Sequence, residues 1–254
     1  MSLWIAGLVP VLLVFFWFTE RWFAHRTYEP MPHWSLWGLI FVVSTSVVGT
    51  VTPWLLGAMG MSASMWPQAI AWGAWGYPAG VLATSLAYYG WHRLEHASDR
   101  FWRWSHQLHH SPRRVDTAGA FYAHPVEVAV KTSIGLLMTT VLLGLDSLTA
   151  SLVLATLTGL SLFQHWNINT PQWLGWILPR PEMHACHHER DVHARNYSDL
   201  PLWDLVFGTY FNPPEFRGSV GFDQDKALRV GDMLMMRDVH RSEHRPACCA
   251  FRSG

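Results

Sequence analysis

The chain has 254 residues and a formal net charge of zero, and half of its residues are hydrophobic while only 14% are charged. A soluble domain carries roughly 25% charged residues, and long apolar stretches here fill 1–91 and 130–165, which argues against a soluble protein and predicts a membrane protein. No basic run interleaved with aromatic residues is present, so nucleic acid is not a predicted partner.

Three apolar segments in the N-terminal third are predicted to be membrane-spanning helices. A helix needs about 20 largely apolar residues to cross the hydrocarbon core, and 3–23, 34–56 and 68–91 satisfy that condition. The charges follow the first segment instead of preceding it, so we expect a retained span and not a cleaved signal peptide. The third segment contains several glycines and is predicted to kink near Pro78.

A helical hairpin is predicted further along the chain. The apolar stretch 134–163 carries one charged residue, Asp146, which lies between a glycine and a serine. This pattern predicts a turn that joins two helices, at about 130–144 and 147–165. Each helix is short for a full crossing, so a spanning hairpin and a re-entrant hairpin both fit the sequence.

The distribution of basic residues predicts the orientation. Arginines follow the first span, the third span and the hairpin, whereas 33–91 and the Asp146 turn contain no Lys or Arg. Because Lys and Arg favour the cytosolic side, we expect the N-terminus outside and every histidine-rich segment at the cytosolic face, in a bacterial inner membrane. The predicted parts are N-terminal transmembrane helices (1–91), a catalytic region that includes the hairpin (92–213) and a cytosolic tail (214–254).

Eight of the 15 histidines form three tight groups, which are His92 and His96; His106, His109 and His110; and His184, His187 and His188. On a helix, residues three and four apart share one face, so each group can direct two or three imidazoles to one point. Eight converging nitrogens exceed the three or four protein ligands of a zinc ion, which predicts two metal ions. Imidazole ligands suit iron, copper, zinc and nickel.

Three further stretches accompany these boxes: HPVE at 124–127, QHWN at 164–167 and NYSDLPLWDLVFGT at 196–209. In this order, the boxes and stretches resemble the fatty acid hydroxylase superfamily, also called the sterol desaturase family, over about residues 80–213. Members of that family are integral membrane enzymes with two metal ions, and they use O2 and external electrons to hydroxylate or desaturate lipids. The ligands that the resemblance implies are His92, His96, His106, His109, His110, His165, His184, His187 and His188.

The resemblance leaves three positions open. Some members carry a second histidine four residues after the position of His165, where this chain has Asn169. Asn169 could ligate through its carbonyl or through water, or not ligate at all. His193 could take its place, or could instead support a ligand or face the substrate, and His124 is a weaker candidate ligand. A ligating histidine usually donates its other N–H to a carboxylate, carbonyl or water. The carboxylates predicted to serve in this way are Glu95, Asp116, Glu127, Asp191 and Asp204.

The segment behind the last box is predicted to hold it in place. A turn at 199–201 precedes an apolar stretch in which Trp203, Leu205 and Phe207 can lie on the membrane or on the helical core, and Gly208 ends this stretch.

The sequence therefore predicts an all-α membrane helical bundle, with about three full spans plus a helical hairpin and a cytosolic histidine-rich cap. The predicted activity is O2-dependent lipid hydroxylation at two iron ions, with desaturation at the same centre as the alternative. We expect that zinc can occupy the site in purified protein. The chain has no dinucleotide fingerprint and no cytochrome module, so a ferredoxin, a cytochrome b5-like protein or a reductase is the expected electron donor.

Two remote alternatives use only part of the pattern. The sequence HRLEH at 92–96 matches the inverted zinc-peptidase motif, but such an enzyme would leave both later boxes unused. A haem held by two histidines would need isolated residues deep in the bilayer, whereas these histidines cluster at the ends of the apolar segments.

Overall fold

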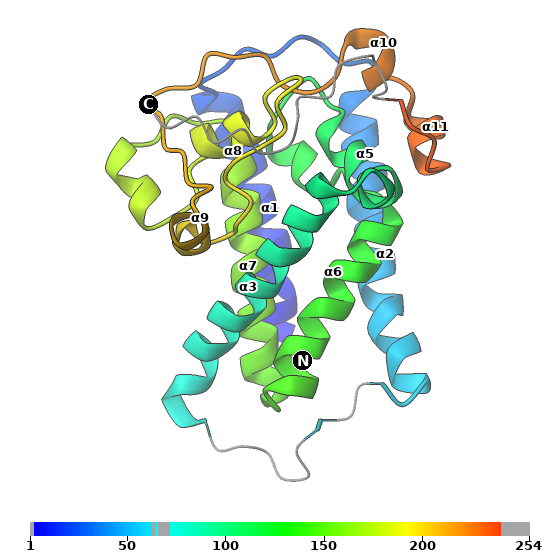
Figure 1. Cartoon of the computed structure of the whole chain (residues 1–254), viewed down its shortest axis with the longest axis vertical. Coiled ribbons are helices and arrows are strands. Elements are labelled where there is room, and N and C mark those ends of the chain that lie inside the picture. Colours follow the sequence, from blue (N-terminus) through cyan, green and yellow to red (C-terminus); the bar gives the residue numbers. More distant parts are fainter. Residues whose placement is uncertain (1–2, 62–63, 66–71, 240–254) are drawn as a thin grey trace.

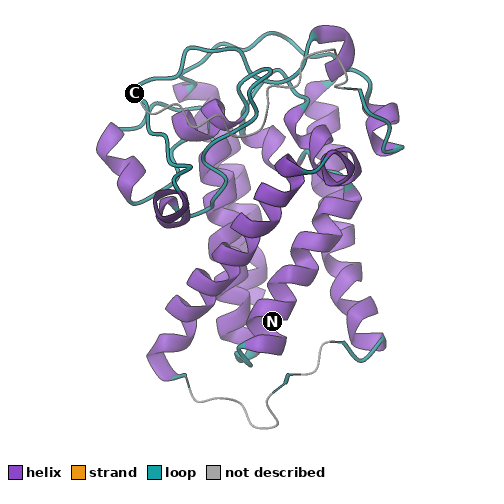
Figure 2. Ribbon diagram, viewed as in Figure 1, coloured by secondary structure: helices purple, strands orange, loops and turns teal. Residues whose placement is uncertain are grey.

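The structure is a computed structural model, and it describes residues 3–61, 64–65 and 72–239. These residues form helices and loops without a strand, apart from one isolated bridge between Glu189 and Val220. The bundle in Figures 1 and 2 consists of α1 (Leu3–Phe23), α2 (Trp34–Ala58), α3 (Gly76–Ala97), α6 (Pro125–Leu136), its π-helical continuation η4 (Leu137–Leu142), and α7 (Ser147–His165).

Among the described residues, three helical units are long and apolar enough to cross a membrane: α2, the continuous unit Pro125–Leu142, and α7. The last two are the helices of the predicted hairpin. Asp146 begins α7 as its N-cap, because its carboxylate accepts hydrogen bonds from the backbone of Leu148 and Thr149. The predicted turn is confirmed, and so is the predicted class, an all-α membrane helical bundle with a histidine-rich helical region.

The outer faces of α1 and α2 are apolar and open. Val11, Phe18, Leu39, Val47 and Trp54 are all exposed on the surface of the chain. Apolar side chains on a spanning helix belong next to lipid. The bundle therefore presents a lipid-facing flank along much of its length.

The expected kink at Pro78 is absent, and this prediction is wrong. A short 3-10 turn, η1 (Gly73–Trp75), precedes α3, which begins at Gly76 and places Pro78 in its first turn. There, the missing N–H of proline has no partner to lose. The part of the predicted span at 68–71 lies outside the described residues. At its other end α3 continues through His92 and His96 without a break.

Two glycines allow the helices that carry the boxes to approach closely. A Cβ at Gly80 of α3 would lie 2.7 Å from Val153 of α7 and 2.9 Å from Leu145. A Cβ at Gly135 of α6 would lie 2.7 Å from both Leu154 and the Tyr88 hydroxyl. The bundle interior at these crossings has no room for a side chain, so α3, α6 and α7 hold a fixed mutual position.

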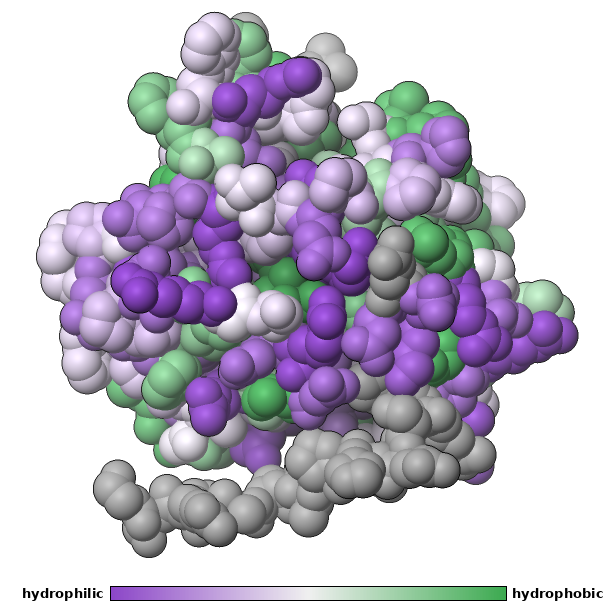
Figure 3. Space-filling model, turned by 90° about the horizontal axis from the view of Figure 1, so that it is seen from above, coloured by the Kyte–Doolittle hydropathy of each residue, from purple (hydrophilic) through white to green (hydrophobic). Residues whose placement is uncertain are grey.

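All histidine boxes lie at one end of the bundle, at the end of α3 and in the cap that 24–33, 98–124 and 166–239 form over it (Figure 1). Polar residues gather over the outer face of this cap, as Figure 3 shows. The short helices of the cap are α4 (Asp99–Phe101), the π-helical η2 (Trp102–His106), α5 (Gln107–His110), η3 (Thr117–Phe121), η5 (Gln172–Trp176), α8 (Pro181–His187), α9 (Pro201–Phe207), α10 (Gln224–Ala227) and α11 (Val230–Leu234).

The described part of the predicted tail is folded onto the cap. Phe222, Ala227 and Met233 are buried and belong to one apolar cluster with Leu108 and Tyr122. Gln107 of α5 also donates a hydrogen bond to a tail carbonyl, with a nitrogen–oxygen distance of 2.8 Å. The segment up to residue 239 therefore covers the histidine-bearing helix α5.

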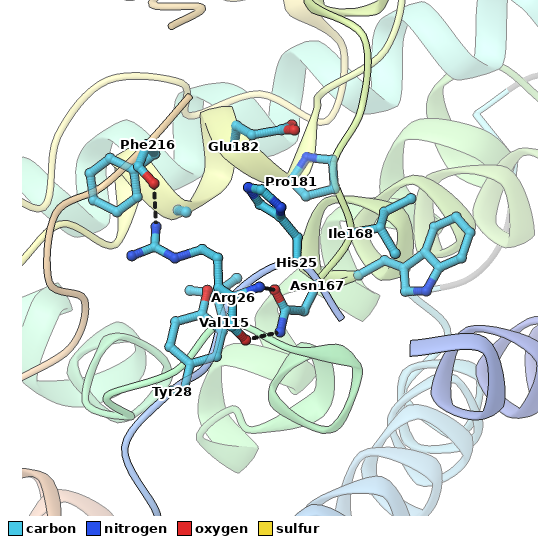
Figure 4. A pocket seen from close by; sticks show the side chains of 11 residues that line it. His25, Arg26, Tyr28, Val115, Asn167, Ile168, Pro181, Glu182 and Phe216 are labelled. Atoms are coloured by element: carbon cyan, nitrogen blue, oxygen red, sulfur yellow. Dashed lines mark hydrogen bonds between the residues drawn. The ribbon is translucent and has the colours of Figure 1, made fainter. Parts of the chain in front are cut away.

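Arg26 ties the end of α1 to two later segments, as Figure 4 shows. Its guanidinium donates to the carbonyls of Phe216 and Gly218, at 2.9 and 2.6 Å. The Asn167 amide accepts from the Arg26 N–H at 3.0 Å and donates to the Arg26 carbonyl at 2.8 Å. These bonds fix the chain that leaves α7 relative to the first helix.

Candidate metal centre

Nine histidines converge in two adjoining groups inside the cap. The ring nitrogens of the first group lie within 4.8 Å of one another, and so do those of the second group. The group of five consists of His92, His96, His106, His110 and His187. The group of four consists of His109, His165, His184 and His188. These are the nine residues that the family resemblance implies as ligands, and the structure brings all of them together.

Chain neighbours contribute to different groups. His109 belongs to the group of four and His110 to the group of five, and His187 and His188 divide in the same manner. The rings of His110 and His188 stack with centroids 4.1 Å apart and planes at 17°. The two groups are therefore in direct contact.

Helical spacing explains most of the convergence. His92 and His96 lie four residues apart on α3, and the nitrogen–nitrogen distance between their rings is 3.2 Å. His106 and His110 are also four apart, with a distance of 3.0 Å. The π-helical segment η2, which ends at His106, precedes the second box, and π-helical turns often occur at functional sites.

The hydrogen bonds of two rings imply a cation between them. Nδ1 of His92 lies 2.6 Å from the Tyr197 carbonyl, and Nδ1 of His106 lies 3.1 Å from the Glu127 carboxylate. Because these oxygens accept hydrogen bonds, both Nδ1 atoms carry the proton, and a neutral ring then has a lone pair at Nε2. The two Nε2 atoms are 2.9 Å apart. Two lone pairs at this distance repel each other unless a cation lies between them.

Two other rings of the site are also oriented by a hydrogen bond from Nδ1 to a backbone carbonyl. Nδ1 of His187 lies 2.7 Å from the Arg195 carbonyl, and its Nε2 is buried without a hydrogen-bond partner among the described residues. Nδ1 of His165 lies 2.8 Å from the Ser161 carbonyl. In each case the second nitrogen presents a lone pair to the interior of the site. The donor set thus fits a pair of metal ions.

Burial keeps the cap imidazoles neutral. Desolvation lowers the pKa of His109, His110, His184 and His188 well below the usual value of 6.5. The pKa of His187 falls to about 3, again mainly because the ring is buried. A neutral imidazole is the form that binds a metal ion, so the site needs no deprotonation at neutral pH.

Two of the five predicted carboxylates contact a histidine of the site. Glu127 bonds to His106, and its Oε1 also lies 3.2 Å from the Lys131 ammonium. An oxygen of Glu95 lies 3.7 Å from His106 Nδ1, and its other oxygen accepts from the Ser105 hydroxyl at 2.7 Å. Both carboxylates are buried. They balance charge around one ring of the group of five.

Asp204 acts through the backbone. Its carboxylate accepts from the backbone N–H groups of Tyr197 and Ser198, at 2.8 and 3.0 Å, and from the Thr209 hydroxyl at 2.7 Å. The carbonyl of Tyr197 in turn holds His92. Asp204 is therefore one step removed from a candidate ligand.

The other two predicted carboxylates lie elsewhere. Asp116 accepts from the Trp34 indole at 3.0 Å, caps η3 through the N–H of Gly119 and pairs with Arg114. Asp191 is exposed on a loop of the cap. Asp116 connects α2 to the cap instead of contacting a histidine of either group.

The three positions left open by the sequence lie outside both groups. His193 Nδ1 is 3.0 Å from Nδ1 of His110, on the far side of that ring from the site. His124 is the N-cap of α6, where its Nδ1 accepts from the backbone of Val126 at 3.1 Å. Asn169 is exposed on a loop.

A loop whose backbone role the sequence did not predict supplies carbonyls to the site. Asp191, His193, Arg195 and Asn196 all have positive φ angles, of 63°, 41°, 70° and 44°. Such conformations are uncommon for residues other than glycine and cluster at functional sites. The loop delivers the Arg195 and Tyr197 carbonyls to two rings, and the His193 backbone bonds to the His96 ring. The only sequence signal was the Asn and Asp residues, which tolerate left-handed backbone.

A helical membrane bundle that ends in two adjoining histidine groups defines a class of membrane protein with a histidine-rich candidate metal centre. Residues 77–209, a little over half of the chain, match the family model described as fatty acid hydroxylase. The chain belongs to the fatty acid hydroxylase family, which confirms the resemblance that the boxes suggested.

One curated relative adds to this assignment. The chain is similar to the ornithine lipid hydroxylase OlsE of Rhizobium tropici, with 28% identity over 139 residues. The aligned region covers 53% of this chain and 41% of that protein, so the chain matches less than half of the relative's length. No solved structure matches the chain significantly.

Proposed function

We propose that this chain is a membrane-bound, O2-dependent lipid hydroxylase with two iron ions. One observation carries the proposal: nine imidazoles form two adjoining groups, and hydrogen bonds leave ring lone pairs directed inward. The group of five would hold one ion and the group of four the other. Iron bound there would supply the O2 activation that attack on an unactivated C–H bond requires.

The nitrogen–nitrogen distances favour a centre of higher coordination number over tetrahedral zinc. With metal–nitrogen bonds of about 2.1 Å, ligand atoms at right angles are about 3.0 Å apart, whereas tetrahedral ligand atoms are about 3.4 Å apart. In the group of five, the Nε2 atoms of three neighbouring ring pairs are separated by 2.9, 3.0 and 3.2 Å. Five imidazoles at this spacing suit a five- or six-coordinate ion, which supports iron.

The residues of the chain would orient and isolate the reaction. Carbonyls and a carboxylate fix the ring tautomers, and three rings of the group of five, those of His106, His110 and His187, are fully buried. The lipid would enter from the bilayer, since the cap lies directly on the spanning helices (Figure 1). The relative from R. tropici is named for ornithine lipid, and a bilayer lipid with a polar headgroup is the proposed substrate class. Electrons would come from a separate donor protein at the cap, on the cytosolic side.

The remote alternatives gain little support from the geometry. A peptidase built on HRLEH would use two of nine converging histidines, and its base, Glu95, is buried and bonded to Ser105. A haem would need two isolated histidines, whereas these rings are packed against one another. The clustering supports a centre with two ions.

Comparative lipid mass spectrometry tests the proposal. Cells that produce the wild-type chain are compared with cells that produce His109→Ala, His187→Ala or His33→Asn. His33 is exposed and lies outside both groups, so its variant is the matched control. A lipid with one additional oxygen atom should accumulate with the wild type and the control, and should be absent with the two ligand variants. Loss of two hydrogens would indicate the desaturase instead, and an unchanged product with both ligand variants would refute the site.

A further inference from the structure

Two segments of the cap that are far apart in sequence share one exposed apolar face. η5 and α9 pack against each other, and the Trp176 and Tyr210 rings lie 5.1 Å apart. The face, called the apolar shelf below, consists of Trp173, Trp176, Ile177, Leu202, Leu205 and Val206. These side chains are between 41% and 63% exposed. A contiguous apolar surface on a polar cap indicates a contact with another apolar phase.

The charged residues of these segments are turned inward. Asp204, the only charged residue of α9, is 1% exposed and bonds to the backbone of Tyr197 and Ser198. η5 contains no charged residue. Arg180, which follows η5, is fully buried and donates to Asn212 and to the Pro213 carbonyl. The outward face of the shelf is therefore free of charge.

The shelf is fixed to α3 on the membrane side of the metal centre. The Trp203 indole donates to the Ser85 hydroxyl at 2.8 Å, and the Phe207 ring stacks on Tyr89 with a centroid distance of 5.1 Å. Ser85 precedes His92 by seven residues, which corresponds to about 10 Å along a helix axis. Figure 1 shows α9 beside the bundle, below α8. The shelf thus lies lower than the ligands, toward the spanning part.

The apolar surface continues from the shelf onto α3. Leu82 and Leu86 are exposed, and they lie on the same face of α3 as Ser85 and Tyr89, because residues three and four apart share a face. The exposed apolar side chains of α3 therefore lead directly to the shelf. This continuity indicates that the same lipid phase covers both.

We propose that the apolar shelf lies in the plane of the membrane interface, with its outer face inserted among the lipids of the leaflet nearest the cap. Tryptophan is enriched at this depth, and short helices with one uncharged face lie there. The lipid contact also has a structural consequence: Asp204 of the same helix accepts from the backbone N–H groups of Tyr197 and Ser198, and the Tyr197 carbonyl bonds to His92. The element that contacts lipid would therefore set the depth of the metal centre in the membrane.

Depth-dependent fluorescence quenching tests the proposal with the full-length chain in phosphatidylcholine vesicles. Cys248 and Cys249 are replaced by serine, whereas Cys186 can remain because it is buried and its thiol pKa is raised to about 12. One cysteine is then introduced, as Trp173→Cys or Val206→Cys, and labelled with an environment-sensitive fluorophore. Arg217→Cys is the matched control, since the Arg217 side chain is 84% exposed on the polar cap.

Three quenchers locate the label: iodide in water, and nitroxides attached to the lipid near the headgroup or deep in the acyl chain. We expect the shallow nitroxide to quench labels at 173 and 206 most strongly, and iodide to quench them several-fold less than the label at 217. Iodide quenching equal to that of the control would overturn the proposal, and so would stronger quenching by the deep nitroxide.

Dilution distinguishes lipid from a second copy of the chain. A tenfold increase in the lipid-to-protein ratio should leave the protection from iodide unchanged. Protection that disappears on dilution would mean that another copy covers the shelf, and would overturn the proposal. Two label sites on separate segments keep the test valid if one substitution disturbs folding.

Discussion

The group of five and the group of four differ in how their rings are held. In the group of five, each ring has a hydrogen-bond partner on the side that faces away from the site. These partners are the Tyr197 and Arg195 carbonyls, Glu127, the His193 side chain and the His193 backbone. In the group of four, the Nδ1 atoms of His184 and His188 are buried with no hydrogen-bond partner in the described part of the chain. One half of the centre is thus fixed by surrounding groups, and the other relies more on its helices.

This difference indicates that the two ions would be bound with unequal strength. Partners behind a ligating histidine orient the ring and raise its basicity, and losing one typically costs 10–100-fold in metal affinity or activity. The group of five has the full set of partners, three of them from the loop with positive φ angles. We therefore expect it to be the tighter site.

The largest effect is expected from removing one ligand of either group. His187→Ala should abolish activity and remove the ion of the group of five, and His184→Ala should do the same for the group of four, because the proposed O2 activation uses both ions. Metal analysis of purified protein should give about half the wild-type metal for each variant. Wild-type metal content in both variants would contradict the division into two sites.

The next largest effect concerns the partner of His106. Glu127→Gln keeps the shape but removes the charge behind the ring, so activity should fall by about 10–100-fold. The metal lost should be that of the group of five, as measured by metal content in the His184→Ala background. Asp191→Asn, an exposed carboxylate, is the control and should behave as wild type.

The two groups should release their metal ions at different pH values. Protons compete with metal ions for imidazole nitrogen, and the group of four should release its ion at the higher pH because two of its rings lack a partner. His187→Ala and His184→Ala chains each retain a single ion, so metal content against pH reports each group separately. Metal release at the same pH from both variants would contradict the expected difference between the two groups.

Protonation of the buried histidines should also make the stability of the metal-free chain depend on pH. Burial lowers the pKa of His184 and His188 in the folded state, so below about pH 6.5 the unfolded state binds more protons than the folded state. Stability should therefore be full above this pH and should fall as the pH decreases further. Thermal unfolding in detergent with a chelator measures this, and stability that rises on acidification would contradict it.

The smallest effect is expected at the attachment of α9 to the bundle. Trp203→Phe removes one hydrogen bond to Ser85, which should cost about 0.5–1.5 kcal/mol in the free energy of unfolding. The weaker attachment of α9 should also lower the metal content of the group of five, because Asp204 and Tyr197 connect α9 to that group. The group of four should keep its metal. Trp173→Phe is the matched control, because Trp173 is exposed, and should change stability by less than about 0.5 kcal/mol.

Much of this architecture could be predicted because its signals are local. The apolar length of α2 and α7, the N-cap at Asp146 and the helical spacing of the boxes each depend on a few neighbouring residues. The convergence of the nine histidines joins distant segments, and it was the family resemblance, not local spacing, that implied this set before the structure placed the residues together.

What the sequence did not predict depends on distant contacts. The left-handed loop of Asp191 to Asn196 is held by Asn196, whose side chain bonds to the backbone of Met183 and Phe211. The tail folds because Phe222 and Met233 find apolar partners more than a hundred residues away. Pro78 was assigned a kink because the start of α3 was expected earlier in the chain.

The division of His109 from His110, and of His187 from His188, has a consequence for how this centre can change. Because one peptide unit separates consecutive Cα atoms by 3.8 Å, the backbone limits how far apart the two binding positions can move. A single inserted or deleted residue in α5 or α8 would disrupt both positions at once. Substitutions around the site can therefore alter its reactivity, while the distance between the two binding positions stays limited by the backbone.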